Sequence, residues 1–230
     1  MLEEINKSNC SIEAVVISER FGDSGEEQDL LKVWLSRNVR IYKVNAALFM
    51  SLSDVKTPQG AVALVRIPEL VLEKTPSQRN ALVLFACGIQ DPGNLGTLIR
   101  AAAAAGATLV CTSKGTVSVR NPKTIRASAG AIFRIPVVEH AEISAFLRYC
   151  ELHSIRAFRT DVCEGLPYTQ TDLASPCAIV LGNEGSGIEQ EQSVQLPAVQ
   201  IPMAEGIESL NVAMAGAILL YEARRQRLDK

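Results

Sequence analysis

Three short segments of the sequence combine glycine with asparagine, serine, glutamate or arginine, which are residue types that bind ligands from loops. The first segment, residues 88–96, reads GIQDPGNLG and is followed by Arg100. The second, residues 181–188, reads LGNEGSGI, and the third, residues 201–211, reads IPMAEGIESLN. Glycine allows the backbone to approach a ligand closely, and the guanidinium of arginine suits phosphate. These segments are therefore the candidates for a functional site.

Each segment also allows an interpretation without a ligand. In the first, Asn94 is the expected N-cap of a helix, and Arg100 on that helix would point to solvent. The glycines of the second allow a flexible connection. In the third, Ser209 is the expected N-cap of the last helix, which places Asn211 in its first turn. The first segment is not a dinucleotide-binding fingerprint, because the pattern GxGxxG is absent.

The residues around these segments predict a parallel sheet. From residue 81 onward, apolar runs typical of strands alternate with stretches of helical periodicity. The expected strands are 81–86, 107–112, 135–138, 155–159 and 178–181, and the expected helices are 94–105, 125–132, 143–152 and 210–227. Strands separated by such helices need crossover connections, which gives an α/β fold with a mostly parallel sheet and helices on both faces. Ligands bind such sheets at the carboxyl ends of the strands, where all three segments are expected.

A smaller domain is expected before this sheet. Strand patterns occur at 14–18, 39–44 and 60–67, and a helical pattern occurs at 28–37. Residues 71–80 are polar and contain a proline, as linkers do. We therefore expect a small α/β domain over 1–70, a linker over 71–80 and a second domain over 81–230.

Composition and charge limit the class of protein. Of the 230 residues 47% are hydrophobic, which supplies a core, and the formal charge of −2 gives no overall basicity. Residues 92–138, however, contain no acidic side chain and these six basic ones: Arg100, Lys114, Arg120, Lys123, Arg126 and Arg134. This segment predicts docking on the phosphate backbone of RNA, with a merely solvated basic surface as the alternative. The arginines at 224, 225 and 227 suit the end of the last helix, whose dipole they complement.

Cysteine spacing and hydropathy indicate the compartment. The six cysteines are too far apart for zinc-ligand spacing, so no metal site is expected, and unpaired thiols are typical of a reducing compartment. The N-terminus lacks the basic and apolar regions of a signal peptide. The longest apolar run is far shorter than the ~20 residues of a membrane span. We expect a soluble, cytoplasmic protein that does not bind membranes.

Taken in order, the three segments resemble the motifs of a known family. DPGNLGxxxR, LGNEGxGI and IPMxxxxESLNVA are similar to the motifs of the SpoU-type (TrmH-like) RNA ribose 2′-O-methyltransferases, which belong to the SPOUT superfamily. The resemblance covers about residues 80–227. It implies a C-terminal trefoil knot, S-adenosylmethionine as cofactor and a homodimer formed through the knotted domain. It also implies that residues 1–70 are a shortened form of a ribosomal-protein-like RNA-binding domain.

The resemblance assigns roles to individual residues. The family's catalytic cluster falls on Asn94, Arg100, Glu184, Ser209 and Asn211. Its cofactor-binding positions fall on Leu181, Gly182, Gly187, Ile201, Met203 and Leu210. Because arginine keeps its proton at any ordinary pH, we expect Arg100 to orient the target nucleotide rather than to act as a base. The family usually carries a threonine and an acidic residue after this arginine, whereas this chain has alanine at 101–103.

Three functions are consistent with these observations. We expect methylation of a ribose 2′-hydroxyl in structured RNA, either rRNA or tRNA, with S-adenosylmethionine as the donor. The alternative is a catalytically idle RNA-binding protein of the same fold, which the alanines at 101–103 and the shortened first domain favour. A small-molecule enzyme on an ordinary doubly wound sheet is the third, and the charge of residues 92–138 argues against it.

Overall fold

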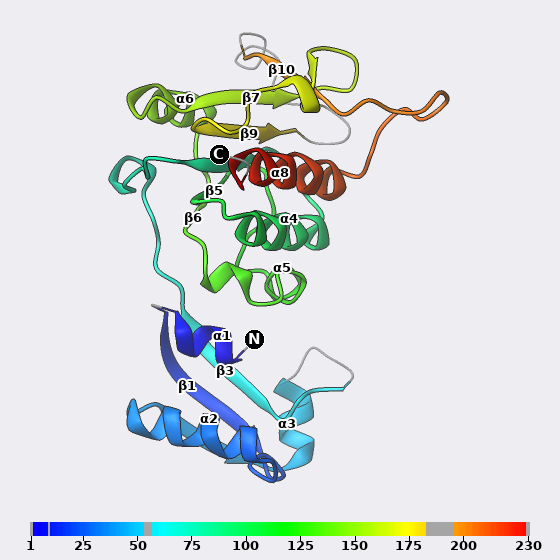
Figure 1. Ribbon diagram of the computed structural model, residues 1–230. Coiled ribbons are helices and arrows are strands. Elements are labelled where there is room, and N and C mark those ends of the chain that lie inside the picture. The colour runs from blue at the N-terminus through cyan, green and yellow to red at the C-terminus, as the bar shows by residue number, and fades with distance from the viewer. Residues whose placement is uncertain (1, 9, 53–56, 183–195, 229–230) are drawn as a thin grey trace. The chain divides into compact units, whose positions relative to one another are not determined.

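The structure is a computed structural model that describes residues 2–8, 10–52, 57–182 and 196–228. It divides into two compact units, Met1–Pro68 and Glu69–Lys230 (Figure 1). Each unit contains a hydrophobic core of its own.

The first unit is a three-stranded sheet with short helices. It contains α1 (Leu2–Lys7), β1 (Ser11–Ser18), α2 (Gly25–Ser36), β2 (Arg40–Val44), α3 (Ala46–Leu52) and β3 (Ala61–Arg66). β1 lies in the middle, parallel to β2 and antiparallel to β3. Ser24 caps α2 in a capping box with Glu27, and Trp34 of α2 packs with Val15 and Ile17 of β1. The four predicted elements are present, whereas the sequence pattern does not predict α1 and α3, which have only six and seven residues.

The second unit is built on a seven-stranded sheet in the order β6-β5-β4-β9-β7-β10-β8. Its strands are β4 (Leu82–Ala86), β5 (Leu109–Thr112), β6 (Val137–Val138), β7 (Arg156–Thr160), β8 (Leu166–Pro167), β9 (Cys177–Leu181) and β10 (Ala198–Gln200). Its helices are α4 (Pro92–Ala105), α5 (Pro122–Ala127), α6 (Ile143–Leu152) and α8 (Val212–Leu228), with 3-10 turns η1 (Leu72–Lys74), η2 (Ala131–Phe133) and η3 (Tyr168–Gln170). All pairs of neighbouring strands are parallel, which confirms the predicted α/β class.

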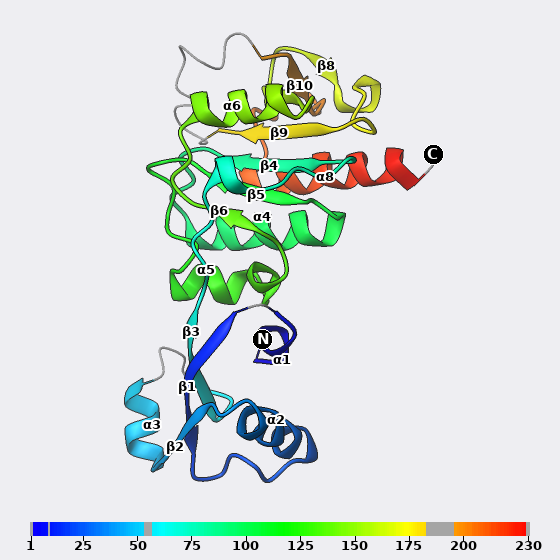
Figure 2. The same cartoon turned by 90° about the vertical axis from the view of Figure 1, so that its left-hand side faces the viewer.

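Helices cover both faces of this sheet (Figure 2). Every residue of the central strands β4 and β9 is buried, as expected of strands that are covered on both sides. On one face Val83 and Phe85 of β4 pack with Phe146 of α6. On the other face α4 and α8 pack side by side. The trefoil knot stays a prediction, because residues 183–195, which connect β9 to β10, lie outside the described residues.

One local prediction in this unit needs correction. The helix expected over 125–132 ends earlier, because Ala129 and Gly130 have positive φ angles of 49° and 87°, which a right-handed helix does not allow. α5 therefore covers only Pro122–Ala127, and η2 follows. Residues 71–80, expected to form a linker, include η1, whose Leu72 is 4% exposed and belongs to the core of the second unit.

Arg227 anchors the end of α8 to the amino ends of the central strands. Its guanidinium donates hydrogen bonds to four backbone carbonyl oxygens at 2.7–3.1 Å, those of Asn80, Ala81, Leu173 and Ser175. Because these acceptors lie far from it in the sequence, the role of Arg227 goes beyond the expected interaction with the helix dipole. Arg225, in contrast, pairs with Glu222 on the same helix.

Arg227→Ala is expected to lower the free energy of unfolding of the second unit by about 1.5 kcal/mol, since four carbonyl oxygens lose a charged donor. Urea unfolding followed by circular dichroism measures this change. Arg224→Ala is the matched control, because Arg224 makes one 3.5 Å hydrogen bond, to the carbonyl oxygen of Ala105. Equal losses of stability in the two variants would contradict the anchoring role of Arg227.

Candidate active site

The turn between β4 and α4 positions the side chain of Asn94. The N-cap of α4 is Asp91, whose carboxylate accepts a hydrogen bond from Asn94 N at 2.8 Å, and Pro92 occupies the first helical position. This bond holds the pKa of the Asp91 carboxyl below its usual value, and the ammonium of Lys123, 3.6 Å away, contributes in the same direction. The prediction of Asn94 as the cap is therefore wrong. Its amide is left available for other partners.

The start of α8 is capped by Asn211. Its Oδ1 accepts hydrogen bonds from Ala213 N at 3.0 Å and Met214 N at 3.3 Å. The helix therefore begins at Val212 rather than at Leu210, and the prediction of Ser209 as its cap is wrong. Ser209 is exposed and precedes the helix without regular structure.

The two asparagines meet although 117 residues separate them. Asn211 Nδ2 donates a hydrogen bond to Asn94 Oδ1 at 3.1 Å. The cap on α8 fixes which end of the Asn211 amide is the donor, and this in turn fixes Asn94 Oδ1 as an acceptor. The amide NH2 of Asn94 remains to donate, and no acceptor within the described residues takes it. The structure thus joins the first and third segments at a point that offers hydrogen-bond donors to a ligand.

Close packing of α8 supports this junction. A Cβ added at Gly216 of α8 would lie 2.4 Å from Leu98 Cδ2 of α4 and 2.7 Å from Leu181 Cδ1 of β9. Glycine at this position lets α8 approach both elements closely. Leu181 is the last residue of β9 and begins the second sequence segment, so the start of that segment also lies beside α8.

Comparison with known proteins identifies the family. The model described as SpoU rRNA Methylase family matches residues 81–221. The chain belongs to this family. It is 34% identical over 191 residues to the 23S rRNA (guanosine(2553)-2′-O)-methyltransferase RlmP of Bacillus subtilis, covering 83% of this chain and 75% of that protein.

Solved structures of SpoU methylases have the same fold. The methyltransferase AviRb from Streptomyces viridochromogenes, in complex with S-adenosylmethionine (AdoMet), superposes with a TM-score of 0.88 at 25% identity, over 100% of this chain and 90% of AviRb. The structure of an RNA 2′-O ribose methyltransferase superposes with a TM-score of 0.81 at 33% identity, over 99% of this chain and 86% of that one. S-adenosylmethionine is the cofactor of this family.

The cofactor-binding positions expected for a SpoU methylase are mainly apolar side chains and backbone groups. Leu181 is buried, and its carbonyl oxygen accepts a hydrogen bond from Cys87 N at 2.8 Å, which ties the end of β9 to the residue that precedes the first segment. Ile201, Met203 and Leu210 are half-buried in a stretch without helix or strand. Apolar, half-buried side chains on such a stretch fit a nucleoside cofactor. Gly182 directly follows β9, whereas Gly187 and the catalytic candidate Glu184 lie outside the described residues.

Arg100 does not lie beside the asparagine pair within one chain. It is exposed, and within the described residues it has no hydrogen-bond or ion-pair partner. It follows Gly96 by one helical turn, and a Cβ at Gly96 would come within 2.5 Å of the backbone of α5. Leu98, in contrast, packs on Gly216 of α8. Because residues two apart on a helix differ by about 200°, Arg100 lies on the α5 side of α4 and the asparagine pair on the α8 side.

The basic segment over 92–138 is partly neutralised by acidic side chains just outside it. The ion pairs are Lys114 with Glu142, Arg120 with Glu139, and Lys123 with Asp91. The Glu142 carboxylate also raises the pKa of Lys114 through its hydrogen bond. Arg126 is exposed like Arg100, and Arg134 is exposed as well. The pairs of Lys114 and Lys123 are exposed, and exposed ion pairs contribute only about 0–1 kcal/mol, so phosphate groups can compete for these two cations.

Two other kinds of site are not found where the structure describes the chain. Its His, Cys, Asp and Glu side chains form no group of three that could hold a metal ion. No helix among the described residues is both long enough and apolar enough to cross a membrane. The three sequence segments also leave out Ser113 and Thr116, two polar residues that lie within four residues of the end of β5.

Proposed function

We propose that this protein methylates a ribose 2′-hydroxyl of ribosomal RNA, with S-adenosylmethionine as the methyl donor. Membership of the SpoU family supports this reaction, and the rRNA methyltransferase RlmP supports rRNA as the class of substrate. The observation that carries the proposal is the hydrogen bond from Asn211 to Asn94, because it unites two of the family's segments around an unused donor.

S-adenosylmethionine supplies a methyl group on a sulfonium, which needs alignment with the attacking oxygen more than it needs an acid or a base. We assign the NH2 of Asn94 to hydrogen-bond an oxygen of the target ribose. Arg100 holds the target nucleotide through its phosphate, because a guanidinium donates in pairs and keeps its charge. Glu184, Ser209 and Asn211 complete the proposed catalytic set.

The remaining residues are assigned to binding. The cofactor rests on Leu181, Gly182, Gly187, Ile201, Met203 and Leu210. The RNA backbone docks on Lys114, Arg120, Lys123, Arg126 and Arg134. Residues 1–70 recruit RNA, residues 71–80 join them to the methyltransferase domain over 81–230, and the protein acts in the cytoplasm.

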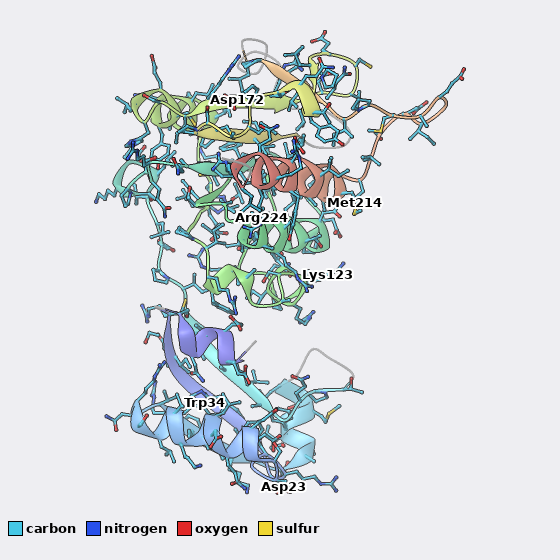
Figure 3. All side chains as sticks on the ribbon, in the orientation of Figure 1. Asp23, Trp34, Lys123, Asp172, Met214 and Arg224 are labelled. Carbon is cyan, nitrogen blue, oxygen red and sulfur yellow. The ribbon has the colours of Figure 1, made fainter. Side chains whose placement is uncertain are left out.

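We also assign a homodimer through the knotted domain. On α8, Met214 (labelled in Figure 3) and Tyr221 are 57% and 50% exposed, and they lie two helical turns apart. Ile218 lies between them and is half-buried. Such an apolar stripe on a helix is typical of an interface. Arg100 faces away from the asparagine pair of its own chain, so we expect it to complete the site of the partner subunit.

Mixing two inactive variants tests this arrangement. Arg100→Ala and Asn94→Ala are each expected to lose most of the methyl transfer. After unfolding and refolding together, half of the dimers are mixed, and each mixed dimer holds one intact site if Arg100 acts across the interface. Activity should then return to about a quarter of the wild-type value. If mixed dimers form, as native mass spectrometry shows, and no activity returns, Arg100 does not act in the partner's site.

The reaction itself is tested by mapping 2′-O-methylated nucleotides in total RNA from cells with and without this protein. A position in rRNA that loses its methyl group supports the proposal. A lost position in tRNA would correct the substrate. An unchanged map, together with no transfer of labelled methyl groups by the purified protein, would favour the catalytically idle RNA-binding protein.

A further inference from the structure

Two buried hydroxyl groups lie behind the turn that leads into α4. Ser113 directly follows β5, Thr116 lies three residues further on, and they are 9% and 7% exposed. Ser113 Oγ accepts a hydrogen bond from Gly88 N at 3.0 Å and donates one to Lys114 O at 2.8 Å. Thr116 Oγ1 donates to Ala86 O at 3.2 Å. Each hydroxyl has a single hydrogen, and these two carbonyl oxygens take both of them.

The backbone between β4 and α4 is consequently held from two sides. On one side Cys87 N donates to the carbonyl oxygen at the end of β9, at 2.8 Å. On the other side Val117 N donates to Ile89 O at 2.8 Å. Gly88 lies between these two points, and its amide is bonded by the side chain of Ser113 rather than by a strand. The path of this backbone therefore depends on a hydroxyl group.

The position of this backbone determines where Asn94 lies. Gly88 has a φ of 66°, a left-handed conformation that glycine adopts at no steric cost, so the hydrogen bond to its amide helps to fix the backbone here. Only two residues separate Gly88 from the cap Asp91, whose carboxylate holds the amide of Asn94. A displacement at Gly88 is therefore passed through this short turn to the start of α4.

We propose that Ser113 and Thr116 are positioning residues for methyl transfer. They hold residues 86–89, and through this backbone they hold Asn94 at the distance from the ribose that the reaction needs. The inference rests on the proposed function, because it concerns the same site. It gives a role to two buried polar side chains that belong to none of the three family segments. Misplacement of a reacting group by ~1 Å costs on the order of 100-fold in rate, so a small shift at Gly88 has a measurable effect.

The test compares four variants of the full-length protein. Ser113→Ala removes the hydrogen bonds of this side chain, and we expect kcat to fall at least ~10-fold while the KM for RNA changes less than ~2-fold. Thr116→Val, which removes the hydroxyl, should lower kcat by a smaller factor, and Thr116→Ser, which keeps it, should restore wild-type turnover. Arg227→Ala is the control for stability, because it weakens the opposite end of the sheet and should leave kcat unchanged.

Amide hydrogen exchange at Gly88 provides a second readout that does not depend on activity. In Ser113→Ala it should become at least ~10-fold faster, while exchange in the centres of β4 and β9 stays as in the wild type. Wild-type kcat in Ser113→Ala, or a kcat that falls equally in Arg227→Ala, would overturn the positioning role. Unchanged exchange at Gly88 would overturn the contact itself. If the wild-type protein transfers no methyl group, the proposed function and the kinetic role fail together, and the exchange measurement still decides whether Ser113 holds the turn.

Discussion

Asn211→Asp is expected to reduce the kcat of methyl transfer about 100-fold without weakening the cap of α8. Aspartate caps helices as well as asparagine does, so the bonds from Ala213 N and Met214 N are kept. A carboxylate has no hydrogen to donate to Asn94 Oδ1, however, and its second oxygen repels that atom. The Asn94 amide then turns its NH2 toward the new carboxylate and presents its oxygen to the ribose. Loss of one positioned donor costs on the order of 100-fold in kcat.

Steady-state kinetics at saturating RNA and cofactor, together with urea unfolding, measure both parts of this prediction. Asn45→Asp is the matched control, since Asn45 also accepts a hydrogen bond at the start of a helix, from Leu48 N at 2.9 Å. It should keep full activity. Unfolding free energies of both variants should lie within about 0.5 kcal/mol of the wild type. Wild-type turnover in Asn211→Asp would show that the direction of the hydrogen bond between the asparagines has no part in the reaction.

The positions of the longer helices α2, α4, α6 and α8 could be predicted from the sequence, but their caps only in part. Pro92 lacks an N–H and suits the first helical position, so the residue before it, Asp91, was a better candidate for the cap than Asn94. That signal is local and could have been used. Ser209 and Asn211 are both good caps, and the choice between them coincides with a contact to Asn94, 117 residues away in the sequence. Local sequence does not contain this contact.

The parallel class of the sheet was predictable, because the central strands are continuous apolar runs. The order of the strands in the sheet was not predictable. β9 pairs with β4 although β5, β6, β7 and β8 lie between them in the chain. This pairing is what brings Leu181 beside the first segment. Similarly, the absence of acidic residues over 92–138 does not leave all of its basic side chains unpaired. Asp91 and Glu139, which flank this segment, form ion pairs with Lys123 and Arg120.

Gly96→Ala is expected to destabilise the second unit by about 2 kcal/mol, although helices ordinarily favour alanine over glycine. In an isolated helix this change stabilises by about 1 kcal/mol. Here the added Cβ would lie 2.5 Å from both Thr124 O and Ala127 Cβ, and 2.9 Å from Ser128 N. Two of these atoms belong to the backbone of α5 and its C-cap, so the helix itself has to move. Overpacking of this kind costs up to about 3 kcal/mol, which exceeds the gain in helix propensity.

Ala104→Gly in the same helix is the control for this argument. Ala104 is exposed, so its replacement removes helix propensity alone and should destabilise by about 1 kcal/mol. If propensity decided both cases, the two substitutions would shift the urea midpoint in opposite directions. We expect shifts in the same direction, with the larger one for Gly96→Ala. Since Arg100 lies one turn beyond Gly96 on the α5 side of α4, the displaced helix should also lower methyl transfer in this variant and leave it intact in Ala104→Gly.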